Sequence, residues 1–176
     1  MERAVEIEIH RFEPSDTQDV IDLILSIQRD EFRIPITIEQ QPDLSSIPAF
    51  YQVDQGDFWV ATNHDRVIGT IGLKDIGNSQ AALRKMFVAE AFRGGKFGVA
   101  AQLLARLLSE ARERGIAEIF LGTTDKFVAA HRFYEKHGFR EIPEDRLPKA
   151  FPLMPVDTKF YLLSFAESQP LETDTI

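Results

Sequence analysis

Alternation and helical spacing divide the first third of the chain into a strand, a helix and a loop. Residues 5–12 alternate apolar and polar side chains, which is typical of a half-buried strand. Apolar residues at helical spacing then predict a helix that Ser15 or Asp16 can cap and that runs to about Phe32. Prolines break the next stretch, so we expect a loop with one short helix over about residues 44–51.

The middle of the chain is rich in β-forming residues between about positions 57 and 88. Two such runs flank Asn63-His64-Asp65-Arg66, which predicts a hairpin although this turn holds no glycine. A second turn at residues 76–80 leads into a third run over residues 81–89. These runs together predict an antiparallel meander of three strands.

The apolar period then changes to that of a helix. Apolar residues from Val99 onward, with Leu103 and Leu107 among them, form one stripe, and Gly115 is placed to end the helix. The apolar run at residues 117–124 fits a buried strand parallel to the one before the helix. The sequence therefore predicts a βαβ unit.

The last part of the chain predicts one more helix and two strands. Asp125 can cap the helix, which Gly138 ends, and residues 139–142 and 156–165 read as strands. We expect a single domain over residues 1–166, followed by an acidic, disordered tail over residues 167–176.

Composition narrows the classes of function. The 176 residues include no cysteine, which excludes disulfides, thiolate catalysis and Cys-based metal sites and fits a reducing, cytoplasmic location. The start is charged and no apolar run reaches membrane-spanning length, so we expect no signal peptide and no membrane contact. The net charge of −8 opposes binding to nucleic acid. The four histidines form no metal-binding pattern, and we expect no metal.

A glycine turn, Arg93-Gly94-Gly95-Lys96-Phe97-Gly98, joins the third meander strand to the long helix. Unpaired N–H groups and the positive end of the helix dipole favour an anion there. The alternative is that the glycines only allow a tight connection. No Ser or Thr follows the lysine and no GxGxxG spacing occurs, so ATP and NAD are poor candidates.

This turn resembles the acyl-CoA pyrophosphate loop of the GNAT superfamily of N-acetyltransferases, which follows a strand ending in valine, here Val88. A second segment, "RFYEKHGF", is similar to the Tyr-x-x-x-Gly-Phe segment of that family, and the resemblance covers residues 5–165. It implies an α/β (mixed α+β) fold: a mostly antiparallel twisted sheet of six to seven strands, about four flanking helices, and a parallel splayed pair at the cofactor.

The resemblance implies that acetyl-CoA is the cosubstrate. Its pantetheine arm would bond to the backbone of Met86, Phe87 and Val88, and its pyrophosphate to the turn. The cofactor-binding residues implied are Met86, Phe87, Val88, Arg93, Gly94, Gly95, Lys96, Phe97, Gly98, Val99, Phe127 and Ala130. Two of them depart from the family pattern. Lys96 replaces a glycine, and Phe127 replaces an asparagine that helps to hold the arm.

The resemblance also implies direct attack by a primary amine. Tyr134 matches the tyrosine beside the sulfur and could protonate the departing thiolate, or it could be a packed core residue. No base is identified, and Glu31, Asp125 and His131 are candidates by region only.

The acceptor pocket is expected between residues 31–44 and 147–155. The side chains that could line it are Phe32, Phe50, Tyr51, Phe151 and Met154. Acidic residues of the first segment, Glu31, Glu39 and Asp43, could attract a cationic amine or could be ordinary solvated charges.

Three classes of function stay open at this point. The leading hypothesis is an acetyltransferase acting on a small-molecule or protein amine. The second is a non-catalytic acyl-CoA-binding module or sensor. Two departures from the family pattern would favour it: Lys96 in the turn, and the absence from residues 81–89 of the glutamate that many relatives carry on the strand before the turn. The third is a structural or nucleic-acid-binding domain, which the net charge opposes. A homodimer is common for the fold but leaves no mark in this sequence.

Overall fold

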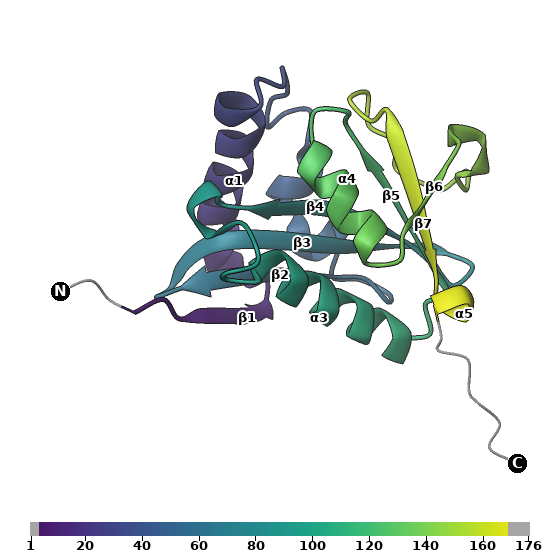
Figure 1. Cartoon of the computed structure of the whole chain (residues 1–176), viewed down its shortest axis with the longest axis horizontal. Helices are drawn as coiled ribbons and strands as arrows, with labels where there is room; N and C mark the ends of the chain where they lie inside the picture. Colours follow the sequence, from purple (N-terminus) through teal and green to yellow (C-terminus); the bar gives the residue numbers. More distant parts are fainter. Residues whose placement is uncertain (1–3, 169–176) are drawn as a thin grey trace, which may run out of the picture.

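The computed structural model describes residues 4–168, which form a seven-stranded mixed sheet (Figure 1). The strands are β1 (Ile7–Arg11), β2 (Asp57–Asn63), β3 (Arg66–Gly77), β4 (Gln80–Val88), β5 (Glu118–Thr123), β6 (Arg140–Ile142) and β7 (Lys159–Ser164). Their spatial order is β1-β2-β3-β4-β5-β7-β6, and only β4 and β5 pair in parallel. This confirms the predicted meander, the βαβ unit and the fold class.

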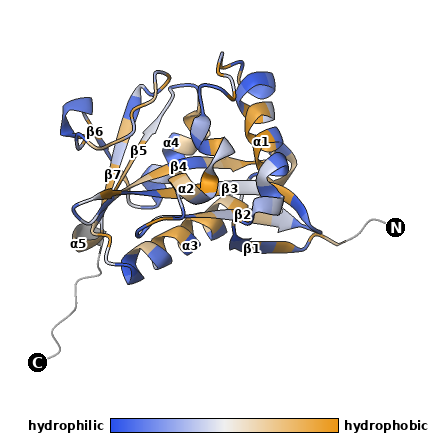
Figure 2. Ribbon diagram, turned by 180° about the vertical axis from the view of Figure 1, so that it is seen from behind, coloured by the Kyte–Doolittle hydropathy of each residue, from blue (hydrophilic) through white to orange (hydrophobic). Residues whose placement is uncertain are grey.

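Helices cover both faces of the sheet. The α-helices are α1 (Thr17–Leu25), α2 (Ile47–Phe50), α3 (Val99–Glu113), α4 (Val128–Lys136) and α5 (Phe165–Ser168). α3 and α4 lie on one face, and α1 and α2 on the other (Figures 1 and 2). α1 continues as a π-helical segment, η2 (Ser26–Glu31), and short 3-10 turns occur at η1 (Pro14–Asp16), η3 (Pro42–Ser45), η4 (Glu90–Phe92) and η5 (Glu144–Arg146).

Burial on both faces explains why β2 is a continuous apolar run. Trp59 and Ala61 belong to the core cluster under α3, whereas Phe58 and Val60 belong to the cluster under α1. All four side chains are fully buried, so alternation of apolar and polar residues disappears in this strand.

The predicted hairpin turn is present in the structure, whereas the predicted helix N-caps are only partly correct. His64 and Asp65 adopt left-handed φ angles of +48° and +67°, so the hairpin forms without glycine. Asp16 is the N-cap residue of α1, but its carboxylate accepts the N–H of Glu13 rather than one in α1. The prediction that Asp125 caps α4 is wrong. Phe127 is the N-cap residue, and the Asp125 carboxylate accepts a hydrogen bond from the Thr124 hydroxyl.

The predicted boundary between domain and tail falls inside α5, which extends to Ser168. The rest of the predicted tail, residues 169–176, lies outside the described residues. No helix within residues 4–168 is long and apolar enough to cross a bilayer. In the same range, no three His, Asp or Glu residues come together as a group that could hold a metal ion.

Candidate active site

The parallel strands at the centre of the sheet separate and leave a pocket between them. β4 and β5 pair only where residues 80–82 lie beside residues 118–120. Beyond that point the two strands diverge (Figure 1), and a pocket of about 520 Å³ opens. Its wall is contributed by β4, β5, α4, the loop before β7, the first turn of η2 (Ile27 and Gln28) and Phe32 just after η2. The splayed pair that the sequence resemblance implied is therefore present.

The glycine turn closes one side of this pocket. Gly94 and Gly98 adopt left-handed φ angles of +92° and +62°, and Gly98 is the N-cap residue of α3. No side chain caps the start of α3, so its first N–H groups and the positive end of its dipole stay available to an anion. Lys96 is not among the residues with positive φ, and the turn therefore tolerates lysine there without left-handed strain.

Residues 26–33, which we call the strap, contact both sides of the splay. The Glu31 carboxylate forms a two-fold ion pair with the Arg93 guanidinium, in which Arg93 Nη2 donates to Glu31 Oε2 over 2.7 Å. The Phe32 ring meets the Phe127 ring edge to face at 4.7 Å. The strap begins with the π-helical turn of η2, a geometry that occurs frequently at functional sites.

Tyr134 lines the pocket from α4. Its ring packs near Phe139 and Tyr161, and no described residue is hydrogen-bonded to its hydroxyl. Burial, with a smaller contribution from Tyr161, raises the pKa of the Tyr134 phenol well above its ordinary value. The hydroxyl is therefore protonated at neutral pH, and burial makes it a weaker acid than a free tyrosine, so it gives up its proton only to a base formed beside it in the pocket.

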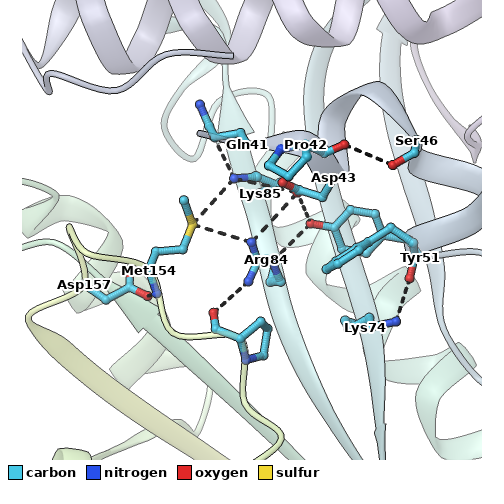
Figure 3. Close-up of polar contacts among 12 residues, drawn as sticks. Gln41, Pro42, Asp43, Ser46, Tyr51, Lys74, Arg84, Lys85, Met154 and Asp157 are labelled. Atoms are coloured by element: carbon cyan, nitrogen blue, oxygen red, sulfur yellow. Dashed lines mark hydrogen bonds and ion pairs between the residues drawn. The ribbon is translucent and has the colours of Figure 1, made fainter. Parts of the chain in front are cut away.

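A cluster of charged side chains lies at the other end of the pocket (Figure 3). Arg84 donates from Nη1 to the Pro152 carbonyl over 2.8 Å and from Nε to the Tyr51 hydroxyl over 3.2 Å. Lys85 donates from Nζ to Gln41 Oε1 over 2.7 Å. Both cationic side chains are almost completely buried, with exposed fractions of 11% and 4%.

The carboxylate nearest to these two cations is that of Asp43, whose hydrogen bond is to Tyr51 and not to either cation. Asp43 Oδ2 accepts a 2.6 Å hydrogen bond from the Tyr51 hydroxyl. It lies 3.9 Å from Arg84 Nη2 and 3.8 Å from Lys85 Nζ, which is ion-pair distance but not hydrogen-bond distance. Burial, together with the neighbouring Arg84, lowers the pKa of Lys85 to about 8, although Asp43 opposes this shift.

A bulge in β4 presents Lys85 at this position. The register with β3 shifts between Thr70 and Gly72, so that Lys85 and Met86 are both inserted opposite Ile71. Lys85 itself has a φ of +54°, and bulges of this kind re-aim side chains next to functional sites.

Asp157 reaches the pocket from the loop before β7, across Gly122 of β5. A Cβ atom at position 122 would lie 2.7 Å from Asp157 Oδ2, so only glycine allows this approach. The same oxygen accepts the Met154 N–H over 3.1 Å. Burial raises the pKa of Asp157, although that N–H, Arg84 and Lys85 act in the opposite direction.

Comparison with known families fits this architecture. Residues 21–139, more than half of the chain, match the family model described as the acetyltransferase (GNAT) family. The chain belongs to the GNAT family of acetyltransferases. A GNAT-family acetyltransferase from Staphylococcus aureus Mu50 is 41% identical, with a TM-score of 0.87 over 90% of this chain and 99% of that one.

Curated GNAT relatives share part of their length with this chain. The N-acetylaspartate synthetase of Danio rerio is 30% identical over 70% of this chain and 45% of its own length. The N-acetyltransferase 8B of Homo sapiens is 29% identical over 60% of this chain and 48% of its own. The chain thus spans about half the length of these relatives. The PaiA N-acetyltransferase of Thermoplasma acidophilum, solved in complex with coenzyme A, shares the fold at 17% identity and a TM-score of 0.69.

Most of the positions implied by the GNAT resemblance come together at the pocket. The residues that line it are Met86, Phe87, Val88, Arg93, Gly94, Phe127, Ala130 and Tyr134. The other positions build the turn and the start of α3 without lining the pocket: Gly95, Lys96, Phe97, Gly98 and Val99. Of the residues expected at the acceptor side, Phe32, Phe151 and Met154 line the pocket, whereas Phe50 and Tyr51 do not.

None of the three regional candidates for the base lines the pocket. Glu31 is paired with Arg93, and the Asp125 carboxylate accepts from the Thr124 hydroxyl. His131 Nε2 lies 2.9 Å from the backbone oxygen of Thr124. The expected attraction of a cationic amine by Glu31, Glu39 and Asp43 finds no support in this geometry, because none of the three lines the pocket either.

Sequence reasoning missed the charged end of the pocket. Its members are Arg84, Lys85 and Asp157. A signal existed for the first two, because two adjacent cations interrupt an otherwise apolar strand. Asp157 had none, since it lies among turn-forming residues of a loop.

Proposed function

We propose that the chain is an N-acetyltransferase that moves an acetyl group from acetyl-CoA to the primary amine of a small molecule. One observation carries the proposal. The splay of β4 and β5 is bordered on one side by an uncapped helix N-terminus and on the other by a buried, protonated tyrosine facing the same pocket. The GNAT family match supports it.

The residues present fit acetyl-CoA. The N–H groups at the start of α3 and the Arg93 guanidinium would hold the pyrophosphate. The edge of β4 at Met86–Val88 lies beyond the last pair with β5 and would bond the pantetheine amides. Phe127 offers no hydrogen bond, and its ring packs against Phe32 of the strap instead. When bound, acetyl-CoA supplies the acetyl group as a reactive thioester.

Two side chains supply the proton transfers. Asp157 is the only carboxylate among the described residues that line the pocket, and its raised pKa suits a group that must both take and release a proton. Asp157 takes the proton from the acceptor's ammonium group. Tyr134 gives a proton to the sulfur as the carbon–nitrogen bond forms and the carbon–sulfur bond breaks. Once the carbon–nitrogen bond has formed, the nitrogen loses its second proton, which passes through water to the Tyr134 phenolate. Asp157 returns the proton it took to solvent.

Relatives support a small acceptor. The name of the Danio rerio relative, N-acetylaspartate synthetase, is that of an enzyme whose product is an acetylated amino acid. The pocket of about 520 Å³ lies within the size range of small-molecule sites.

Calorimetric titration with acetyl-CoA, desulfo-CoA and ATP tests the cofactor site. We expect saturable binding of both CoA ligands and none of ATP. A thiol-release assay with amine acceptors then tests transfer. Binding without release for any amine would favour the non-catalytic binding module, and no binding at all would end the acetyltransferase proposal.

A further inference from the structure

The charge of the pocket is opposite to that of the chain. The whole chain carries a formal net charge of −8. The described residues that line the pocket include four cations, Arg84, Lys85, Arg93 and Lys126, against one carboxylate, that of Asp157. Arg93 belongs to the glycine turn, where a phosphate is expected, and Lys126, just before α4, donates from Nζ to the Arg33 carbonyl over 3.5 Å. Arg84 and Lys85 lie at the other end and need a different explanation.

These two cations share an unusually weak partner. Arg84 Nη2 is directed at Met154 Sδ over 3.5 Å, and Lys85 Nζ points at the same sulfur over 3.7 Å (Figure 3). A thioether is a poor hydrogen-bond acceptor. Their other hydrogen bonds go to neutral acceptors on Gln41, Tyr51 and Pro152, and the nearest carboxylate, that of Asp43, lies at ion-pair distance, 3.8–3.9 Å. Neither buried cation therefore has an anion within hydrogen-bond distance. Met154 comes from the loop before β7.

We propose that Arg84 and Lys85 form a carboxylate-binding clamp for the amine acceptor, and that the acceptor carboxylate takes the place of the Met154 sulfur. The inference rests on the proposed acetyl transfer and names its substrate class: a zwitterionic amino acid. Arg84 and Lys85 bind its carboxylate, and Asp157, which lies next to Met154 on the side away from the two cations in Figure 3, binds its ammonium group.

The first experiment measures binding without turnover. Succinate carries carboxylates but no amine, and succinamide is its neutral counterpart. We expect succinate, and not succinamide, to raise the melting temperature of the CoA-saturated protein. Lys85→Gln and Arg84→Gln should each weaken succinate binding at least tenfold. The matched surface variants Lys136→Gln and Arg106→Gln should leave it within twofold. Equal binding of the two probes would overturn the clamp.

A second variant covers the case in which Arg84→Gln or Lys85→Gln fails to fold. Met154→Glu places a carboxylate in the clamp from within the chain. It should raise the melting temperature and abolish succinate binding while acetyl-CoA still binds, whereas Met154→Gln, of the same length but neutral, should stabilise the protein less. A Met154→Glu protein that still binds succinate as tightly as the wild type would contradict the inference.

Turnover separates this inference from the proposed function. Thiol release should be fast with glycine, aspartate or glutamate and at least tenfold slower, through a raised KM, with glycinamide and ethylamine. Equal turnover of amines with and without a carboxylate would refute the clamp but would not contradict acetyl transfer. Loss of acetyl-CoA binding would end acetyl transfer, and the same comparison of succinate with succinamide on the CoA-free protein would then decide the clamp.

Discussion

Two buried charge clusters in this protein are built in opposite ways. Asp57, fully buried at the start of β2, accepts hydrogen bonds at both oxygens. Oδ2 accepts from Arg11 over 2.7 Å and from Arg114 over 2.9 Å, while Oδ1 accepts from Gln52 and from the Phe58 N–H. This network joins β1, β2 and the end of α3, and every lone pair of the carboxylate has a donor.

The cluster at Arg84 and Lys85 is the incomplete counterpart. There, the hydrogen bonds of the two cations go to neutral oxygens and to one thioether sulfur. The nearest carboxylate, that of Asp43, lies beyond hydrogen-bond distance of both. Burying charges without full partners costs stability, so a fold keeps such an arrangement only where something else completes it. Both clusters are buried and charged. What distinguishes the structural cluster from the binding site is whether each charged group has a hydrogen-bonded partner of opposite charge within the protein.

The largest effect should come from breaking the complete network. Asp57→Asn leaves Arg11 and Arg114 without their carboxylate, and we expect it to lower the free energy of unfolding by about 3 kcal/mol. Urea unfolding measures this loss. Asp22→Asn on the exposed side of α1 is the matched control and should cost less than about 0.5 kcal/mol. Similar losses in the two variants would refute a structural role for the Asp57 network.

The same network sets a pH dependence. Burial alone would raise the pKa of Asp57, but the hydrogen bonds from Gln52, Arg11, the Phe58 N–H and Arg114 outweigh it and lower that pKa. A lowered pKa means that the stabilisation is complete above the unfolded pKa of about 3.9 and is lost as the pH falls through the folded value. Asp57→Asn should therefore flatten the acid limb of the stability curve.

Tyr134→Phe should have the next largest effect. If the phenol protonates the leaving sulfur, its removal should lower kcat about 100-fold while the Kd for acetyl-CoA stays within twofold. Steady-state thiol release and calorimetry give the two values. An unchanged kcat would show that Tyr134 is a packing residue.

The sequence patterns predicted the fold more completely than the residues of the candidate site. Strands, helices and the parallel pair follow from periodicity, and the glycine turn from spacing. The bulge at Lys85 could not be predicted, because it depends on the register between β3 and β4 rather than on any residue type. Asp157 reaches the pocket only through a tertiary contact with Gly122. The cap at Asp125 failed because α4 begins two residues later, at an N-cap residue without a side-chain hydrogen bond.

A smaller effect is the pH dependence of anion binding at the Arg84–Lys85 cluster. Asp43, Arg84 and Asp157 are the charged groups that act on Lys85, and together with burial they set its pKa at about 8. Below that pH Lys85 is a cation and binds an anion, and above it the charge is lost. Succinate affinity should therefore fall about tenfold per pH unit above 8. Lys85→Arg, which stays charged, should remove this dependence, and a pH-independent wild type would show that Lys85 does not contact the anion.

The smallest effect concerns the Glu31–Arg93 ion pair, which is fully hydrogen-bonded like the Asp57 network but borders the pocket like the Arg84–Lys85 cluster. Glu31 and Arg93 are fully paired, but their side chains are 27% and 34% exposed, so Glu31→Gln should change the free energy of unfolding by less than about 1 kcal/mol. Its effect should fall on the cofactor instead. Since Glu31 competes with phosphate for the Arg93 guanidinium, its neutralisation should tighten CoA binding by a few fold, measured by calorimetry at low salt, where such pairs are least screened. Weaker binding would mean that the strap holds Arg93 in place for the cofactor rather than competing with it.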